Sequence, residues 1–420
     1  MPYLQDEEAT LARLAHAGPA ALSVESEGLR TTPVFKAQAP FPLSEANLLC
    51  KALELADAMA RRPNVGGGEA PLVDLRRLAH EGFFIAPLPE RYGGLGLGTE
   101  PRKHRLLLQI LAALGGGDLS LGRLYEGHVN ALILITAYGT AAQVQRAAND
   151  ARNGMLFGVW NSGGADPTKL SRVTSGTGKL LLNGCKFFAS GAALLDRAVV
   201  TAECEAAGWQ MTLLAMDRLR AAGAAQVDYG SWHPLGMQAS ESYGIEFLQA
   251  PVDEHDLIGD VGDLYREPLF RGGAVRFAAV HAGAVLRLRT MFAEWLNSNR
   301  RAGDPYQIVR MGEIALAARE AELWVEHAAS TAEAGLSVNA DAAARERMLA
   351  CANMMRVRME QIGTATMQRV AAGAGARGLL QPWRFERIIR DLTMYLRQPG
   401  PDETMAEIGR AALRNTGVSE

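Results

Sequence analysis

Two neighbouring carboxylates, Asp402 and Glu403, lie near the end of the chain in the stretch YLRQPGPDET (395–404). A carboxylate can accept a proton from a substrate carbon when it lies within hydrogen-bond reach of that proton. Asp402 also follows the turn residues Gly400 and Pro401, and Asp is a preferred N-cap of helices. The stretch therefore predicts either a general base or a helix cap, and the sequence leaves both roles open.

Two adjacent arginines, Arg300 and Arg301, occur in NRRAGDPYQ (299–307). The planar guanidinium group matches the oxygens of a phosphate or diphosphate, so this pair is a candidate anion-binding site. Arginines at the end of a helix also complement the helix dipole, which gives a purely structural alternative. Both interpretations remain open on the sequence alone.

Histidines and cysteines show no metal-binding pattern. The four cysteines are scattered, with no CxxC motif and no histidine at ligand spacing, so we predict no metal site and a reducing, cytoplasmic location. His281 falls among apolar residues in RFAAVHAGAVLRL (276–288) and is predicted to be a core residue. His233 and His255 are expected to be surface or structural residues.

Composition favours a large globular protein. The chain has 420 residues, of which 48% are hydrophobic, and a formal net charge of −3. It carries no basic tail or stripe that would indicate nucleic-acid binding. It also lacks an apolar run of the roughly 18–20 residues that a membrane span needs. The acidic start, MPYLQDEEATLARLAHAG, has no signal-peptide core.

Three regions with different patterns must position these residues. Residues 1–152 are mainly helical, with Ser44 as a predicted N-cap. Residues 153–262 contain five or six short runs rich in β-branched and aromatic residues, which predict a small antiparallel barrel or sandwich. Asn183-Gly184 is expected to form a hairpin turn there. Residues 263–420 read as long helices with short loops, which favours a bundle.

Four stretches in the same order resemble the acyl-CoA dehydrogenase family. They are PERYGGLGLG (89–98), NGCKFFASG (183–191), WHPLGMQASESYGIEF (232–247) and GAGARGLLQPWRFERIIRD (373–391). The resemblance covers roughly residues 45–413. It implies an α+β, mainly α fold, with an N-terminal helical domain, a central β-domain and a C-terminal four-helix bundle. It also implies a homodimer or homotetramer that binds FAD between subunits.

The resemblance also assigns residues to the two halves of the flavin cofactor. The residues expected around the flavin ring are Trp160, Asn161, Ser162, Phe188, Ala189 and Ser190. An aromatic face beside small hydrogen-bonding groups suits a planar ring of this kind. The residues expected at the diphosphate and adenine are Arg300 or Arg301, Gly375 and Gly378. Arg276 matches an arginine that lies near the substrate.

The position of the catalytic glutamate is the main departure from the family. Counting from Arg390-Asp391, the usual position is occupied by Pro399, and the alternative position falls on Val275 or Arg276. None of these side chains can accept a proton at neutral pH.

Three interpretations follow from this substitution. In the first, the chain catalyses α,β-dehydrogenation of an acyl substrate, and the base has moved to Glu403 or Asp402. The substrate can be a CoA thioester, and the sequence does not identify the electron acceptor. Alternatively, the chain is a flavin monooxygenase or oxidase that uses FAD or FMN on a non-CoA substrate. In the third interpretation, the chain is a non-catalytic binding or assembly subunit.

Overall fold

The chain folds from helices into a sheet and back into helices, in the predicted order. The computed structural model describes residues 44–62, 71–163, 166–172, 180–204, 208–380, 383 and 385–415. The predicted fold class, mainly α with a central β region and a helical C-terminal part, is confirmed.

The first helices surround a nearly continuous apolar core. They are α2 (Glu45–Ala60), α3 (Leu72–His80), α4 (His104–Gly117), α5 (Leu119–Tyr138) and α6 (Ala141–Arg152). Ser44 is the N-cap of α2, as predicted, and its hydroxyl accepts a hydrogen bond from the backbone N–H of Asn47 at 3.3 Å. Helices α4 and α5 are apolar on most sides because α2, α9 and β1 pack around them.

Eight strands of the described residues form one sheet. They are β1 (Phe157–Trp160), β2 (Lys169–Arg172), β3 (Leu180–Lys186), β4 (Arg197–Cys204), β5 (Gly208–Ala215), β6 (Ala225–Asp228), β7 (Gly244–Val252) and β8 (Leu257–Ile258). The strand order is β6-β7-β3-β2-β4-β5-β8, with β1 also paired to β4. The short helix α7 (Met216–Ala221) follows β5.

The sheet departs from the antiparallel prediction at two pairs. Strand β1 pairs in parallel with the first half of β4, and β2 pairs in parallel with its end. The two strands therefore run in the same direction along one edge of β4. The other pairs, such as β4 with β5 and β3 with β7, are antiparallel.

The hairpin turn predicted at Asn183-Gly184 is wrong, because these residues form an irregularity inside β3. The register between β3 and β7 shifts at this point, and the Asn183 side-chain oxygen accepts a hydrogen bond from the Gln249 backbone at 2.8 Å. Gly184 has φ +103°, and a Cβ there would lie 2.6 Å from the Pro167 carbonyl oxygen. The dipeptide that favours φ > 0 is therefore used in a β-bulge.

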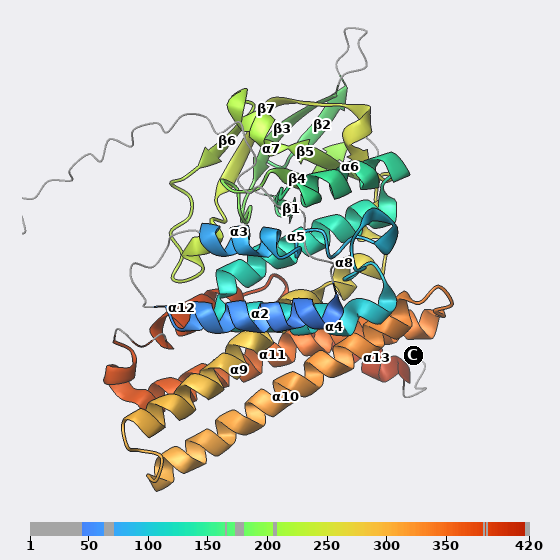
Figure 1. The fold of residues 1–420 in the computed structure, drawn as a ribbon. Coiled ribbons are helices and arrows are strands. Elements are labelled where there is room, and N and C mark those ends of the chain that lie inside the picture. The colour runs from blue at the N-terminus through green and yellow to red at the C-terminus, as the bar shows by residue number, and fades with distance from the viewer. Residues whose placement is uncertain are drawn as a thin grey trace, which may run out of the picture. The chain divides into compact units, whose positions relative to one another are not determined.

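Long helices form the C-terminal part. They are α8 (Leu269–Gly272), α9 (Ala274–Ser298), α10 (Pro305–Leu336), α11 (Ala342–Gly378), α12 (Phe385–Tyr395) and α13 (Pro401–Asn415). Helices α9, α10 and α11 pack against one another, and α12 packs on α9 and α11 (Figure 1). These four helices form the predicted bundle. Helix α13 lies against α11.

The predicted division into residues 1–152, 153–262 and 263–420 stays a prediction. Helix α6 ends at Arg152 and β1 begins at Phe157, so the change of secondary structure falls near the first boundary. The contacts nevertheless group the described residues, from Ser44 to Asn415, as one unit. Within the described residues, no helix combines the length and apolar character that crossing a membrane requires.

Candidate active site

A cavity of about 510 Å³ lies between the end of β1, helices α5 and α9, and the connection from α12 to α13. This volume is within the range of small-molecule sites, roughly 300–1,000 Å³. Its lining includes six of the residues predicted from the sequence: Trp160, Asn161, Ser162, Phe188, Arg276 and Glu403. The fold therefore brings together residues that are up to 243 positions apart in the chain.

Ala189 and Ser190 support this cavity from behind. Ala189 is fully buried, and its backbone N–H donates to the Tyr243 carbonyl at 3.1 Å. The Trp160 indole N–H donates to the Ser190 carbonyl oxygen at 3.0 Å. The first bond ties the turn after Phe188 to the residue before β7, and the second ties it to the end of β1.

Asn161 is held by three groups. Its side-chain oxygen accepts hydrogen bonds from the hydroxyls of Thr201 at 2.9 Å and Tyr265 at 3.2 Å. Its main-chain carbonyl accepts one from the Lys186 ammonium at 3.2 Å, and that ammonium also donates to Thr201 at 3.0 Å. Burial lowers the pKa of Lys186 to about 8. The sequence analysis did not predict this role of Lys186. A lysine inside an apolar strand is nevertheless a signal, because a buried lysine usually has a hydrogen-bond or charge partner.

Phe188 presents its ring to the cavity from a strained backbone. Its φ is +53°, which is rare for a bulky residue, and its side chain is 63% exposed. The ring contacts Trp232 edge-on at 6.1 Å between centroids. Such an exposed aromatic face beside a cavity is available for a planar ligand.

A buried charged cluster forms the opposite wall. Glu126, which is only 2% exposed, accepts hydrogen bonds from the side chains of Arg123 and Asn130. Arg276 donates from Nε to the Asn130 side-chain oxygen at 2.5 Å, and burial lowers its pKa. Sequence reasoning missed Glu126 and Asn130, although both are polar residues within the otherwise apolar α5.

Tyr395 and His281 contact each other where this wall meets α12. Their rings are edge-on, with centroids 4.5 Å apart. The prediction that His281 is a core residue is confirmed, because it is 2% exposed. Burial lowers the pKa of His281 to about 3.

Replacing His281 with phenylalanine is expected to make the protein less sensitive to acid. The folded pKa of about 3 lies below the ordinary value of 6.5, so the unfolded chain takes up a proton first as the pH falls. This histidine therefore favours folding above pH 6.5, and that contribution is lost as the pH falls from 6.5 towards 3. Between pH 7 and pH 5 the variant should lose about 2 kcal/mol less unfolding free energy than the wild type.

Denaturant unfolding at both pH values measures this difference. His80→Phe is the matched control, because His80 is exposed on α3 and its substitution leaves the buried His281 in place. Equal losses for His281→Phe and the wild type would contradict the prediction.

The connection from α12 to α13 places Glu403 at the cavity and leaves Asp402 outside its lining. Helix α13 begins at Pro401, so the prediction that Asp402 is its N-cap is wrong. Proline is favoured at the first helical position because its missing N–H is not needed there, which shifts the start by one residue. The carbonyl of Pro399 accepts a hydrogen bond from the Arg356 guanidinium.

Another carboxylate, Glu407, closes the wall between α8, α11 and α13. Its two oxygens accept hydrogen bonds from Arg271 and Asn353, each at 2.8 Å. Among the described residues that line the cavity, four are arginines and three are glutamates, an excess of one positive charge. The arginines are Arg123, Arg271, Arg276 and Arg356, and the glutamates are Glu126, Glu403 and Glu407.

The residues predicted for the diphosphate and adenine lie outside this cavity. Arg301 donates to the Gly373 carbonyl at 3.3 Å, which places it beside the part of α11 that contains Gly375. Gly375 interrupts the helix with φ +61°, and Gly378 is the last residue of α11. Arg300 lies in the preceding turn with φ +56°. The binding role of these four residues stays a prediction.

The N-terminal part of the chain and its overall fold are similar to those of known proteins. Residues 53–154 match the model of the acyl-CoA dehydrogenase N-terminal domain. Dibenzothiophene monooxygenase TdsC from Paenibacillus sp. A11-2 has a similar fold, with a TM-score of 0.75 and 20% identity over 88% of this chain and 97% of TdsC. One TdsC structure is a complex with FMN and indole.

Two further structures extend the comparison. Methanesulfinate monooxygenase MsuC from Pseudomonas fluorescens has a TM-score of 0.73 and 21% identity, over 89% of this chain and 97% of MsuC. Butyryl-CoA dehydrogenase from Megasphaera elsdenii has a TM-score of 0.71 and 17% identity, over 89% of this chain and all of that enzyme. At these identities the likeness concerns the fold. Residues 53–154 thus match the N-terminal domain of the acyl-CoA dehydrogenase family, and the chain has the acyl-CoA dehydrogenase fold.

Proposed function

We propose that this chain is a flavin-dependent oxidoreductase that acts on a small substrate with an anionic group. The observation that carries this proposal is the composition of the 510 Å³ cavity. One wall has an exposed aromatic ring and the hydrogen-bonding end of a strand, and the other has a buried arginine and a carboxylate. The match of residues 53–154 to the acyl-CoA dehydrogenase N-terminal domain and the FMN present in a TdsC structure support a flavin in this position.

The residues of the first wall fit a flavin ring. Phe188 offers an exposed face for stacking, while Asn161 and Ser162 offer main-chain and side-chain polar groups for a ring edge. When bound, a flavin supplies a hydride acceptor at the cavity. We propose FAD in a homodimer or homotetramer, with Arg300 or Arg301, Gly375 and Gly378 near its diphosphate and adenine.

Arg276 is proposed to bind the anionic group of the substrate. Glu126 is already engaged by Arg123 and Asn130, so the charge of Arg276 is only partly compensated. The excess positive charge of the lining also favours an anion. An acyl substrate, as a free acid or a CoA thioester, belongs to this class.

For the reaction we propose α,β-dehydrogenation with Glu403 as the base. The Glu403 carboxylate would accept the α-proton, and a bound flavin would supply the acceptor for the hydride from the β-carbon, so that a C=C bond forms. Glu126 and Glu407 each accept hydrogen bonds from neighbouring side chains. Among the described residues, Glu403 is the lining carboxylate for which no ion pair or side-chain hydrogen bond is found.

Oxygenation is the second candidate, and Pro399 is the observation that favours it. Proline has no proton-accepting side chain, and its carbonyl is bound by Arg356. Two proteins of the same fold, TdsC and MsuC, are monooxygenases. For this reaction a reduced flavin would supply the two electrons that, with O₂ and two protons, place one oxygen atom in the substrate and release the other as water. FMN and a non-CoA substrate would then be expected.

Anaerobic mixing of the FAD-loaded protein with a panel of acyl-CoA thioesters and free acids tests the first reaction. Bleaching of the flavin absorbance is the expected result. The absence of bleaching across the panel, together with substrate-dependent oxygen consumption when reduced FMN is supplied, would favour oxygenation. A colourless protein that binds neither FAD nor FMN would overturn both candidates and favour the binding or assembly subunit.

Replacing Arg276 with glutamine is expected to weaken substrate binding strongly. Loss of a buried charge-assisted contact costs about 2–4 kcal/mol, which corresponds to a roughly 30- to 1,000-fold increase in KM for an anionic substrate. Steady-state kinetics with an active substrate measure the change, and flavin content should stay the same. Arg76→Gln, at an exposed site on α3, is the matched control. An unchanged KM would contradict the assignment.

A further inference from the structure

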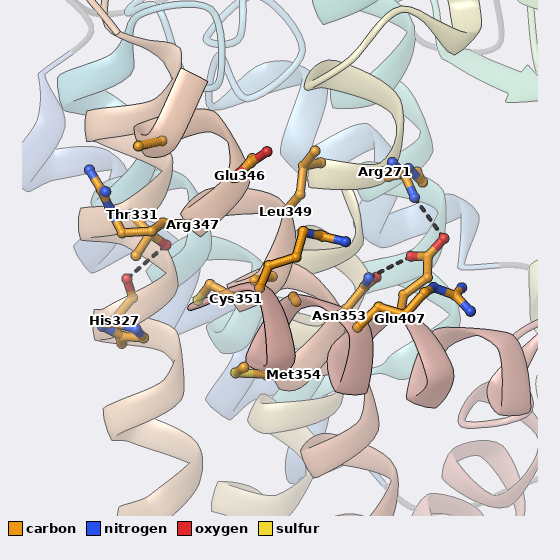
Figure 2. Close-up of a pocket in the computed structure, with 15 residues that line it drawn as sticks. Arg271, His327, Thr331, Glu346, Arg347, Leu349, Cys351, Asn353, Met354 and Glu407 are labelled. Carbon is orange, nitrogen blue, oxygen red and sulfur yellow. Dashed lines mark hydrogen bonds and ion pairs between the residues drawn. The ribbon is translucent and has the colours of Figure 1, made fainter. Parts of the chain in front are cut away.

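A second cavity of about 740 Å³ lies on the other side of Glu407, between helices α10, α11 and α13. It shares Arg271, Asn353 and Glu407 with the first cavity. Figure 2 shows the Glu407 carboxylate between Arg271 and Asn353, with a hydrogen bond to each. These three residues therefore form a partition, and the second cavity is separate from the proposed active site.

Three exposed arginines give the second cavity its charge. Arg347 comes from α11, and Arg410 and Arg414 come from α13. Arg410 and Arg414 are four residues apart, so they project from the same side of α13. Within the described part of the chain, none of the three makes an ion pair or a side-chain hydrogen bond. Glu346 is the lining carboxylate that is not part of the partition.

Two other polar side chains of the lining are already engaged in hydrogen bonds within the protein. Thr331 already donates to the His327 carbonyl at 3.1 Å, and Asn353 donates to Glu407. The other walls include the apolar side chains of Leu349 and Met354. The three guanidinium groups are thus the main free donors in a cavity that is otherwise partly apolar.

We propose that this second cavity binds a phosphate-bearing small molecule through Arg347, Arg410 and Arg414. Like charges one helical turn apart repel each other, and an anion with a charge near −2 relieves that repulsion. The guanidinium fork matches phosphate oxygens, and the volume suits a ligand of nucleotide size. This site is independent of the proposed flavin and substrate sites and is not required for the reaction.

Isothermal titration of inorganic pyrophosphate and of ADP into the full chain tests the proposal. The protein is first loaded with FAD and then separated from unbound FAD by gel filtration, so that any flavin site is filled and no free FAD competes for the second cavity. At least one of the two anions is expected to bind with a Kd below the millimolar range at 50 mM NaCl. Binding should weaken at least tenfold at 500 mM NaCl, because the contacts are largely ionic.

The double variant Arg347→Gln plus Arg410→Gln should weaken binding at least tenfold, and Arg410→Gln alone at least threefold. Arg76→Gln is the matched control and should bind as the wild type does. Equal affinity for ADP and pyrophosphate would indicate that the site recognises only the phosphate groups. Tighter binding of ADP would indicate that the site also recognises the nucleoside and that its ligand is a nucleotide. The proposal is overturned if neither anion binds, or if both arginine variants bind like the wild type. Neither result depends on whether the flavin is reduced by any substrate.

Discussion

Glu403→Gln is expected to slow flavin reduction by an active acyl substrate by about 10²–10⁴-fold, the usual contribution of a positioned general base. Glutamine keeps the size and polarity of the side chain but cannot accept the α-proton. Because Glu403 is exposed at the first turn of α13, the substitution should leave folding and flavin content unchanged. Anaerobic stopped-flow mixing, which follows the bleaching of the flavin, gives the rate directly.

Asp402→Asn is the matched control for this experiment. Asp402 is next to Glu403 in the chain and also exposed, but it does not line the cavity. Its substitution should therefore change the rate less than threefold. Similar rates for Glu403→Gln and the wild type would show that this carboxylate is not the base, and would favour the oxygenation to which Pro399 points.

Gly236→Ala is expected to destabilise the fold by about 3 kcal/mol or more, at or above the upper end for overpacked sites. A Cβ at this position would lie 2.1 Å from the Arg390 carbonyl oxygen and 2.5 Å from the Asp391 amide nitrogen. The neighbouring Met237 backbone N–H donates to the Asp391 carboxylate at 2.7 Å. The substitution would push α12 away from the segment before β7 and break this contact.

Denaturant unfolding measures the effect, and Gly409→Ala is its matched control. Gly409 lies within α13, and no atom would come within 4 Å of an added Cβ. That substitution should raise helix stability by about 0.5–1 kcal/mol. Because α12 leads directly to the Pro399 connection, Gly236→Ala should also reduce substrate affinity under conditions where the variant still folds. Comparable stability of the two alanine variants would contradict the steric argument.

Local features of the fold were predictable from the sequence, and features that depend on distant partners were not. The cap at Ser44 follows from residue type and position, and its hydrogen bond is local. The parallel pairing of β1 and β2 with β4 joins segments about 35–40 residues apart, and no dipeptide encodes it. Asn183-Gly184 was misread because φ > 0 serves a turn and a bulge equally well.

In the candidate site, too, some residues were predictable from the sequence and others depend on distant partners. The family resemblance predicted Phe188 and Asn161 as flavin-binding residues and Arg276 as a substrate-binding residue; all three line one cavity, and their binding roles stay predictions. It did not reveal that Lys186 would bond to the Asn161 carbonyl, or that Glu126 would sit between two donors on α5. Those roles depend on which side chains face each other after folding, and a buried charge in an apolar element is the only trace they leave in the sequence.

The partition made by Glu407 has a kinetic consequence. Opening it breaks two hydrogen bonds that together contribute about 2 kcal/mol, so roughly one molecule in thirty is expected to have the two cavities joined at any moment. Displacements of a packed helix occur on the order of microseconds to milliseconds. A typical enzyme turns over about ten times per second. Water and small solutes are therefore expected to exchange between the two cavities many times within one catalytic cycle.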